Sequence, residues 1–82
     1  MNQNTSVVNM KTWILVSIDP DKISECIEEI KSYPWVEKVT PVRGVWDLIV
    51  EIDSKHEEVI YLINNNTLIR TAIRLHEIEY DT

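Results

Sequence analysis

After a polar start, this chain has short hydrophobic segments of two kinds: strand-like runs, and segments in which apolar residues recur at helical spacing. Residues 12–18 (TWILVSI) are mostly β-branched, aromatic or aliphatic and too few for a helix of several turns, so they predict a strand. Asp19 and Pro20 come next, a pair typical of the N-cap and first position of a helix. Four apolar residues then recur at i, i+3, i+4 and i+7, which predicts one buried helical stripe: Ile23, Cys26, Ile27 and Ile30.

Two further strands and a turn are predicted after this helix. Tyr33-Pro34 ends the helix, and residues 36–42 form a second strand, placed at a sheet edge because Pro41 cannot donate a backbone hydrogen bond. Arg43-Gly44-Val45 joins it to a third strand as a hairpin, and Gly44, the only glycine, reaches positive φ without steric cost. That strand, residues 46–53, carries alternate apolar residues on one face: Trp46, Leu48, Val50 and Ile52.

A second helix and a last strand complete the pattern. Ser54-Lys55-His56-Glu57 fits a capping box, in which Ser54 and Glu57 each satisfy a backbone N–H at the helix start. The helix runs through Val59, Ile60, Leu62 and Ile63, and Asn64-Asn65-Asn66 ends it with an expected left-handed C-cap. Residues 68–78 predict the final strand.

The resulting order, βαββαβ, predicts an α+β, ferredoxin-like fold, with a four-stranded antiparallel sheet and both helices on one face. Apolar residues nevertheless occur on both sides of the strands. Because the helices cover only one side, we expect a second copy of the chain to cover the other, giving a dimeric α-β sandwich. The residues expected in this dimer interface are Trp13, Leu15 and Ile49.

Composition narrows the class of protein. The 82 residues allow one modest domain, here assigned to residues 12–82 after a flexible arm at residues 1–11. Fourteen acids against eight bases give a formal net charge of −6, which argues against direct binding to nucleic acid. A single cysteine, no secretory signal and no apolar run near 18 residues predict a cytoplasmic protein without a membrane segment.

Residues 12–80 resemble the effector-binding and oligomerisation domain of the leucine-responsive/AsnC (Lrp/AsnC) regulators, in the stand-alone form that lacks the helix-turn-helix. The likeness rests on the Asp-Pro helix start, on residues 33–39 (YPWVEKV) where the family often has Pro-Gly-Val, on residues 43–50 (RGVWDLIV) where it has Gly-x-Tyr-Asp-hydrophobic, and on Arg70-Thr71.

This resemblance implies a homodimer that often assembles into a ring of dimers and binds an amino acid or related metabolite between dimers. It also implies an effect on transcription through full-length Lrp/AsnC partners. Turn N–H groups near Gly44 would receive an α-carboxylate, Asp47 would hold the ammonium and Thr71 would add a hydroxyl contact. The implied effector-binding residues are Arg43, Gly44, Val45, Trp46, Asp47 and Thr71.

Plainer interpretations of these residues stay open. Gly44 and Asp47 can simply serve the hairpin, Trp46 can be a packing residue, and Arg43 and Arg70 can pair with the abundant acids. Ile73 stands where the family frequently has a second hydroxyl, so a purely structural interaction module without a small-molecule ligand is the alternative function.

Catalysis and metal binding have little support in the sequence. No nucleophile elbow, phosphate-binding glycine loop or Cys/His ligand spacing is present, so we expect no enzyme activity, no metal and no cofactor. The two histidines, His56 and His76, fall on a predicted helix start and a predicted strand. Cys26 lies on the apolar helical stripe, where a small buried hydrophobe is expected rather than a nucleophile.

Overall fold

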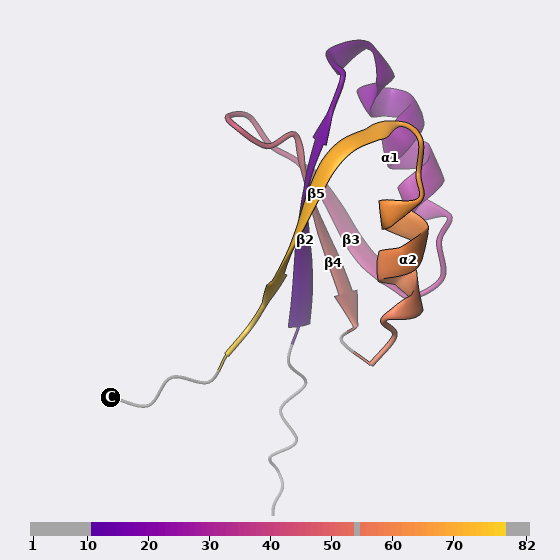
Figure 1. Ribbon diagram of the computed structural model, residues 1–82, viewed down its shortest axis with the longest axis vertical. Helices are drawn as coiled ribbons and strands as arrows, with labels where there is room; N and C mark the ends of the chain where they lie inside the picture. The colour runs from indigo at the N-terminus through magenta and orange to yellow at the C-terminus, as the bar shows by residue number, and fades with distance from the viewer. Residues whose placement is uncertain (1–10, 54, 79–82) are drawn as a thin grey trace, which may run out of the picture.

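The computed structural model describes residues 11–53 and 55–78, which form one antiparallel sheet covered on one side by two helices (Figure 1). The strand order in the sheet is β3-β4-β2-β5, and each neighbouring pair is antiparallel. This is the predicted ferredoxin-like α+β fold. The elements are β2 (Lys11–Ile18), the 3-10 turn η1 (Pro20–Lys22), α1 (Ile23–Lys31), β3 (Val36–Pro41), β4 (Leu48–Asp53), α2 (Glu58–Asn64) and β5 (Ile69–His76).

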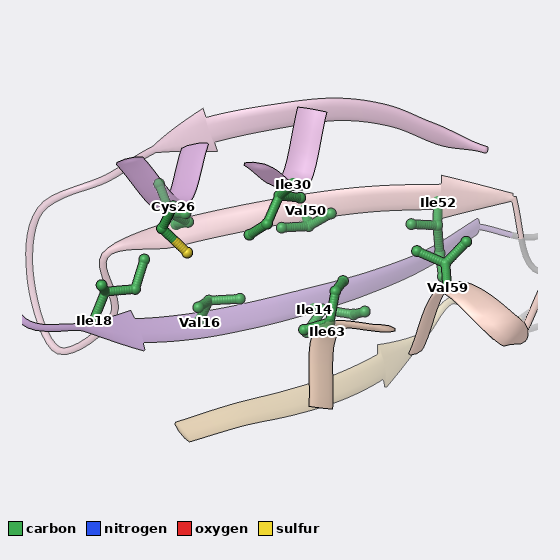
Figure 2. Close-up of a cluster of buried hydrophobic side chains, with 10 residues drawn as sticks. Ile14, Val16, Ile18, Cys26, Ile30, Val50, Ile52, Val59 and Ile63 are labelled. Carbon is green, nitrogen blue, oxygen red and sulfur yellow. The ribbon is translucent and has the colours of Figure 1, made fainter. Parts of the chain in front are cut away.

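The core lies between the sheet and the helices (Figure 2). Alternate residues of the two central strands point toward the helices, because successive side chains of a strand face opposite sides. The buried side chains are Ile14, Val16 and Ile18 from β2, Leu48, Val50 and Ile52 from β4, Cys26 and Ile30 from α1, and Val59 and Ile63 from α2. The predicted core faces of β2, β4 and α1 are therefore confirmed.

The predicted hairpin is longer in the structure. β4 begins at Leu48, so Trp46 and Asp47 belong to the connecting loop and the prediction that they start the strand is wrong. The physical reason is that the pairing of β4 ends at Leu48, opposite Val16 of β2 and Pro41 of β3. Beyond these pairs Asp47 makes only single backbone bonds: its N–H donates to Val16 O at 2.8 Å, and its carbonyl accepts the Val42 N–H at 2.9 Å. At the chain start, Lys11 is the first residue of β2 rather than the end of an arm; residues 1–10 lie outside the described part.

The helix ends also differ from prediction. Asp19 precedes η1, with Pro20 at its first position as expected, but the Asp19 side chain makes no capping hydrogen bond. The predicted capping box places Glu57 inside the second helix, whereas α2 starts at Glu58 with Glu57 as N-cap residue; Ser54 is outside the described residues. The expected left-handed asparagine C-cap is wrong, because Asn65 at the C-cap has φ −98°.

Asparagine nevertheless ends α2 by another contact. The side chain of Asn66 is buried, donates from Nδ2 to the Tyr33 hydroxyl at 2.8 Å and accepts the Leu68 N–H at Oδ1, also at 2.8 Å. Tyr33 lies in the turn after α1, so this amide joins the C-terminal ends of the two helices. The buried amide of Asn66 is thus satisfied by a part-buried hydroxyl and a part-buried backbone N–H.

Candidate functional site

The loop between β3 and β4 carries most of the predicted effector residues. Arg43, Gly44 and Val45 are exposed, and the Val45 side chain retains 85% of its accessible surface. Gly44 has φ +139°, a conformation that side chains rarely adopt, and an added Cβ there would meet no atom within 4 Å. The glycine is therefore required by backbone conformation and not by lack of space. Trp46 is half-buried at the base of the loop.

Asp47 fastens the loop to the end of β2. Its Oδ2 accepts the Ile18 N–H at 2.8 Å, while its own N–H donates to Val16 O. A carboxylate accepting a backbone N–H makes a stronger bond than a neutral group would. Asp47 thus has a structural role within one chain, and Oδ1 is the oxygen left to hold an ammonium group.

Thr71 lies at the same end of the sheet as the loop. It is paired with Ser17 of β2, the residue before the Ile18 that binds Asp47. Neighbouring strands are about 4.8 Å apart, so Thr71 and the loop flank β2 at a separation of about 10 Å. The fold therefore brings the predicted effector residues to one end of the sheet, with Thr71 and the loop on opposite sides of β2.

The sheet face opposite the helices carries an apolar surface, which we name the open-face stripe. Leu15 pairs with Ile49 on one side and with Ile73 on the other, and Trp13 pairs with Leu75. Trp13, Leu15 and Ile49 are half-buried, while Ile73 and Leu75 are 43% and 44% exposed. The sequence prediction missed Ile73 and Leu75, although their alternation with Ala72 and Arg74 would have assigned them to this face.

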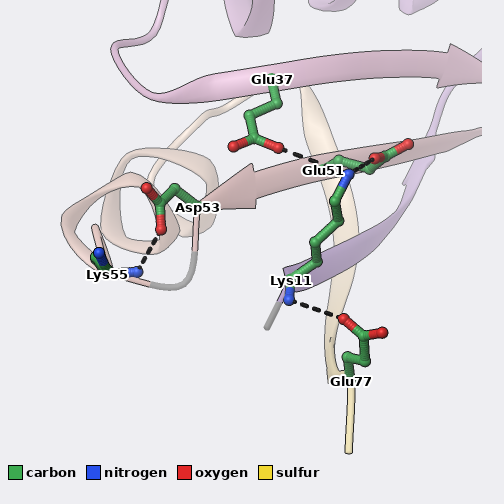
Figure 3. A network of polar contacts seen from close by, with 6 residues as sticks. All are labelled: Lys11, Glu37, Glu51, Asp53, Lys55 and Glu77. Carbon is green, nitrogen blue, oxygen red and sulfur yellow. Dashed lines mark hydrogen bonds and ion pairs between the residues drawn. The ribbon is translucent and has the colours of Figure 1, made fainter. Parts of the chain in front are cut away.

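A group of charged residues lies at one end of the open-face stripe (Figure 3). The Lys11 ammonium lies 3.2 Å from Glu51 and 3.9 Å from Glu37, and the Lys11 backbone N–H donates to Glu77 at 3.1 Å. Glu51 is the least exposed of these groups. Exposed pairs of this kind contribute about 0–1 kcal/mol each, so their main effect is to give this end of the face a polar border.

The remaining candidate residues have structural partners. Arg70 pairs with Asp19 at 3.3 Å, as expected from its acidic surroundings. The His56 ring stacks on Trp35 with centroids 4.2 Å apart and an interplanar angle of 8°. His76 Nδ1 lies 3.3 Å from the Thr12 hydroxyl. Burial, with further contributions from Glu29 and Glu25, raises the pKa of the Cys26 thiol to about 11, which makes it a poor nucleophile.

Across residues 11–53 and 55–78, no three His, Cys, Asp or Glu side chains converge in a way that could hold a metal ion. Within the same ranges, no helix has the length and apolar character needed to cross a membrane.

Several solved structures share this fold. The crystal structure of FFRP-DM1 has a TM-score of 0.74 and 22% identity, and the match covers 84% of this chain and 99% of that one. E. coli AsnC has a TM-score of 0.73 and 11% identity, with coverage of 99% and 62%. The transcriptional regulator NMB0573 of Neisseria meningitidis, solved in complex with L-Met, has a TM-score of 0.66 and 15% identity, with coverage of 96% and 60%. No family model matches the sequence, and neither does any curated protein.

The resemblance to Lrp/AsnC regulators is thus confirmed at the level of the fold. The chain matches nearly all of FFRP-DM1 but only about three fifths of AsnC and NMB0573. At these identities the likeness concerns the fold alone.

Proposed function

We propose that this chain is a dimerising, effector-binding module that senses an amino acid or related metabolite and modulates transcription through full-length Lrp/AsnC partners. The observation that carries the proposal is the open-face stripe. It runs across three strands on the side of the sheet that the helices leave uncovered. A contiguous apolar patch of this kind is typical of a protein interface, and an identical chain offers a self-complementary surface.

The effector part of the proposal rests on the loop and Thr71. Exposed backbone at Gly44 can offer N–H groups to a carboxylate, and Asp47 Oδ1 can accept an ammonium. Thr71 flanks the other side of β2, so residues of a neighbouring dimer could complete the site between them. The L-Met complex of NMB0573, which shares the fold, supports an amino acid as the ligand class.

Native mass spectrometry of the purified chain, alone and with each of the twenty amino acids, tests both parts together. We expect an even-numbered assembly that retains one amino acid per subunit. A monomer would refute the module as proposed. An assembly that retains none of the twenty would refute amino-acid sensing.

A second candidate is a structural interaction module of the same fold with no small-molecule ligand. The observation that favours it is the Asp47 contact, because a carboxylate already bonded to Ile18 N–H serves the hairpin within one chain. The apolar Ile73 near Thr71 on the same face points in the same direction. An assembly of defined size that binds no amino acid is the result this candidate predicts.

A further inference from the structure

A groove runs between α2 and β5 on the helix side of the sheet, away from the loop and the open-face stripe. Its larger part, of about 460 Å³, is lined by Glu57, Glu58, Ile60, Tyr61, Asn64 and Arg74. It continues into a hollow of about 270 Å³ that shares Ile60, Asn64 and Arg74 and adds Ile14 and Ala72. The larger part falls within the range of small-molecule sites, about 300–1,000 Å³.

The two walls of the groove come from residues that regular structure places side by side. On α2, Glu57, Tyr61 and Asn64 follow one another at i, i+4 and i+7, so they share one side of the helix. On β5, Arg74 pairs with the buried Ile14 and therefore faces the helices. Arg74 Nη1 lies 3.5 Å from Glu57 Oε1, and this ion pair joins the two walls.

The charges of the groove select the kind of ligand. Arg74 and Glu57 neutralise each other, which leaves the Glu58 carboxylate as the excess charge. Tyr61 is 74% exposed, and the face of an aromatic ring attracts a cation. The formal net charge of −6 for the whole chain adds a long-range attraction for positive ligands.

The apolar side chains at the bottom of the groove favour a ligand with an apolar group. Ile14, Ile60 and Ala72 are apolar and buried or half-buried, so they offer a surface to a short aliphatic or aromatic group. An anion would meet Glu58 and would compete with Glu57 for Arg74. The ammonium of a zwitterion would pair with Glu58, but its carboxylate would compete with Glu57 for Arg74.

We propose that this groove is a binding site for a small organic cation, a primary amine with a short apolar body. The site is distinct from the proposed effector residues, and it stays accessible when two sheets pack face to face because it lies on the helix side. The proposal therefore goes beyond the proposed function and does not depend on it.

Three ligands with the same branched body test the charge selection: 3-methylbutylamine, L-leucine and 4-methylpentanoate. Each is titrated into the ¹⁵N-labelled full chain while amide ¹H–¹⁵N shifts are recorded. We expect saturable shifts at Ile60, Tyr61, Asn64 and Arg74 with the amine, and no saturable shifts there with the acid. Higher salt should weaken amine binding, because both partners are charged and exposed.

Two variants locate the interaction. Glu58→Gln should weaken amine binding at least fivefold, and Tyr61→Leu at least twofold, whereas Glu28→Gln on the exposed side of α1 should leave it unchanged within twofold. Equal binding of acid and amine, or an unchanged affinity in Glu58→Gln, would overturn the proposal. So would amine shifts confined to residues 43–47 and 71. Shifts of those residues with leucine bear only on the proposed effector site, so the two proposals can fail separately.

Discussion

Asp47 serves the fold through its side chain, because its Oδ2 accepts the Ile18 N–H. The proposed contact with an effector ammonium would fall to Oδ1. Asp47→Asn keeps an oxygen acceptor for that N–H, whereas Asp47→Ala removes it. We therefore expect Asp47→Ala to lower the free energy of unfolding by about 1–3 kcal/mol and Asp47→Asn by less, as measured by urea denaturation.

The same pair of variants separates the two candidate functions. If Asp47 binds an effector ammonium, both variants lose the ligand-dependent rise in melting temperature, because both lack the negative charge. Retention of that rise in Asp47→Asn would contradict the ammonium role. A loss of assembly in Asp47→Ala alone would favour the structural interpretation of the hairpin.

Because of Cys26, we expect the free energy of unfolding to fall as the pH rises above about 9. Its folded-state pKa of about 11 lies above the ordinary value of 9.0, so the folded chain holds its proton more tightly than the unfolded chain. The stabilisation is complete below about pH 9 and is lost as the pH rises toward 11, because only the unfolded thiol ionises there. A shift of this size corresponds to about 2–3 kcal/mol.

Cys26→Ala should remove this contribution. Burial also raises the pKa of Tyr33, with a smaller contribution from Cys26, so Tyr33→Phe is introduced into both proteins to keep this second titration out of the difference. Urea denaturation of both proteins at pH 8, 9, 10 and 11 measures the effect. Parallel pH profiles for the two proteins would contradict the assigned pKa of the thiol.

At the scale of elements, Asn66 joins the ends of α1 and α2. We expect Asn66→Ala to cost about 1–3 kcal/mol of unfolding free energy, because it leaves the part-buried Tyr33 hydroxyl and Leu68 N–H without this partner. Asn65→Ala is the matched control, since Asn65 is the exposed neighbour. Thermal and urea denaturation should separate the two variants, and equal stabilities would show that the amide network contributes nothing.

The turn between α1 and β3 holds a tryptophan in an unfavourable backbone conformation. Trp35 has φ +64°, a region that costs a residue with a side chain about 1–2 kcal/mol, and its ring stacks on His56. Trp35→Ala keeps the strain and loses the stack, whereas Trp35→Gly relieves the strain. We therefore expect Trp35→Gly to be more stable than Trp35→Ala by about 1 kcal/mol in urea denaturation. This is opposite to the usual finding that alanine is the more stabilising of the two residues. A glycine variant less stable than the alanine variant would contradict the strain assigned to Trp35.

The sequence predicts element types better than element ends. Alternation and helical spacing identify β2, β4 and α1 because one face of each is buried, and burial imposes a period that can be read from the chain. Trp46 and Asp47 continue the β4 pattern but lie in a loop, because the pairing of β4 with both neighbouring strands ends at Leu48. Where such pairing between distant segments ends leaves no local signal.

In the candidate site, too, local features could be predicted from the sequence and tertiary contacts could not. Gly44 and the Asp-containing loop are visible in the sequence because glycine and aspartate are characteristic of turns. The Asn66–Tyr33 bond and the Trp35–His56 stack join residues more than 20 positions apart, and the groove at Arg74 depends on which β5 residues face the helices. These features follow from strand register and helix packing, which a single sequence does not specify.

At the scale of the whole molecule, exposed apolar residues occur both on the open face of the sheet and on α2. The open-face stripe includes Ile73, 43% exposed, and the outer side of α2 includes Leu62, 40% exposed. Sequence analysis predicted Leu62 as one of four apolar residues of the second helix, and of these four Val59 and Ile63 are the fully buried ones. The two residues have nearly equal exposure, so they form a matched pair for a test of the proposed dimerisation through the open-face stripe.

The most direct test of the account is the mass of the chain in solution, measured by size-exclusion chromatography with light scattering. We expect an even number of subunits for the unmodified chain and for Leu62→Lys, and a folded monomer for Ile73→Lys, because a lysine in the open-face stripe would bury an unpaired charge in the dimer. A monomeric unmodified chain, or an Ile73→Lys variant that assembles as before, would contradict dimerisation through this face.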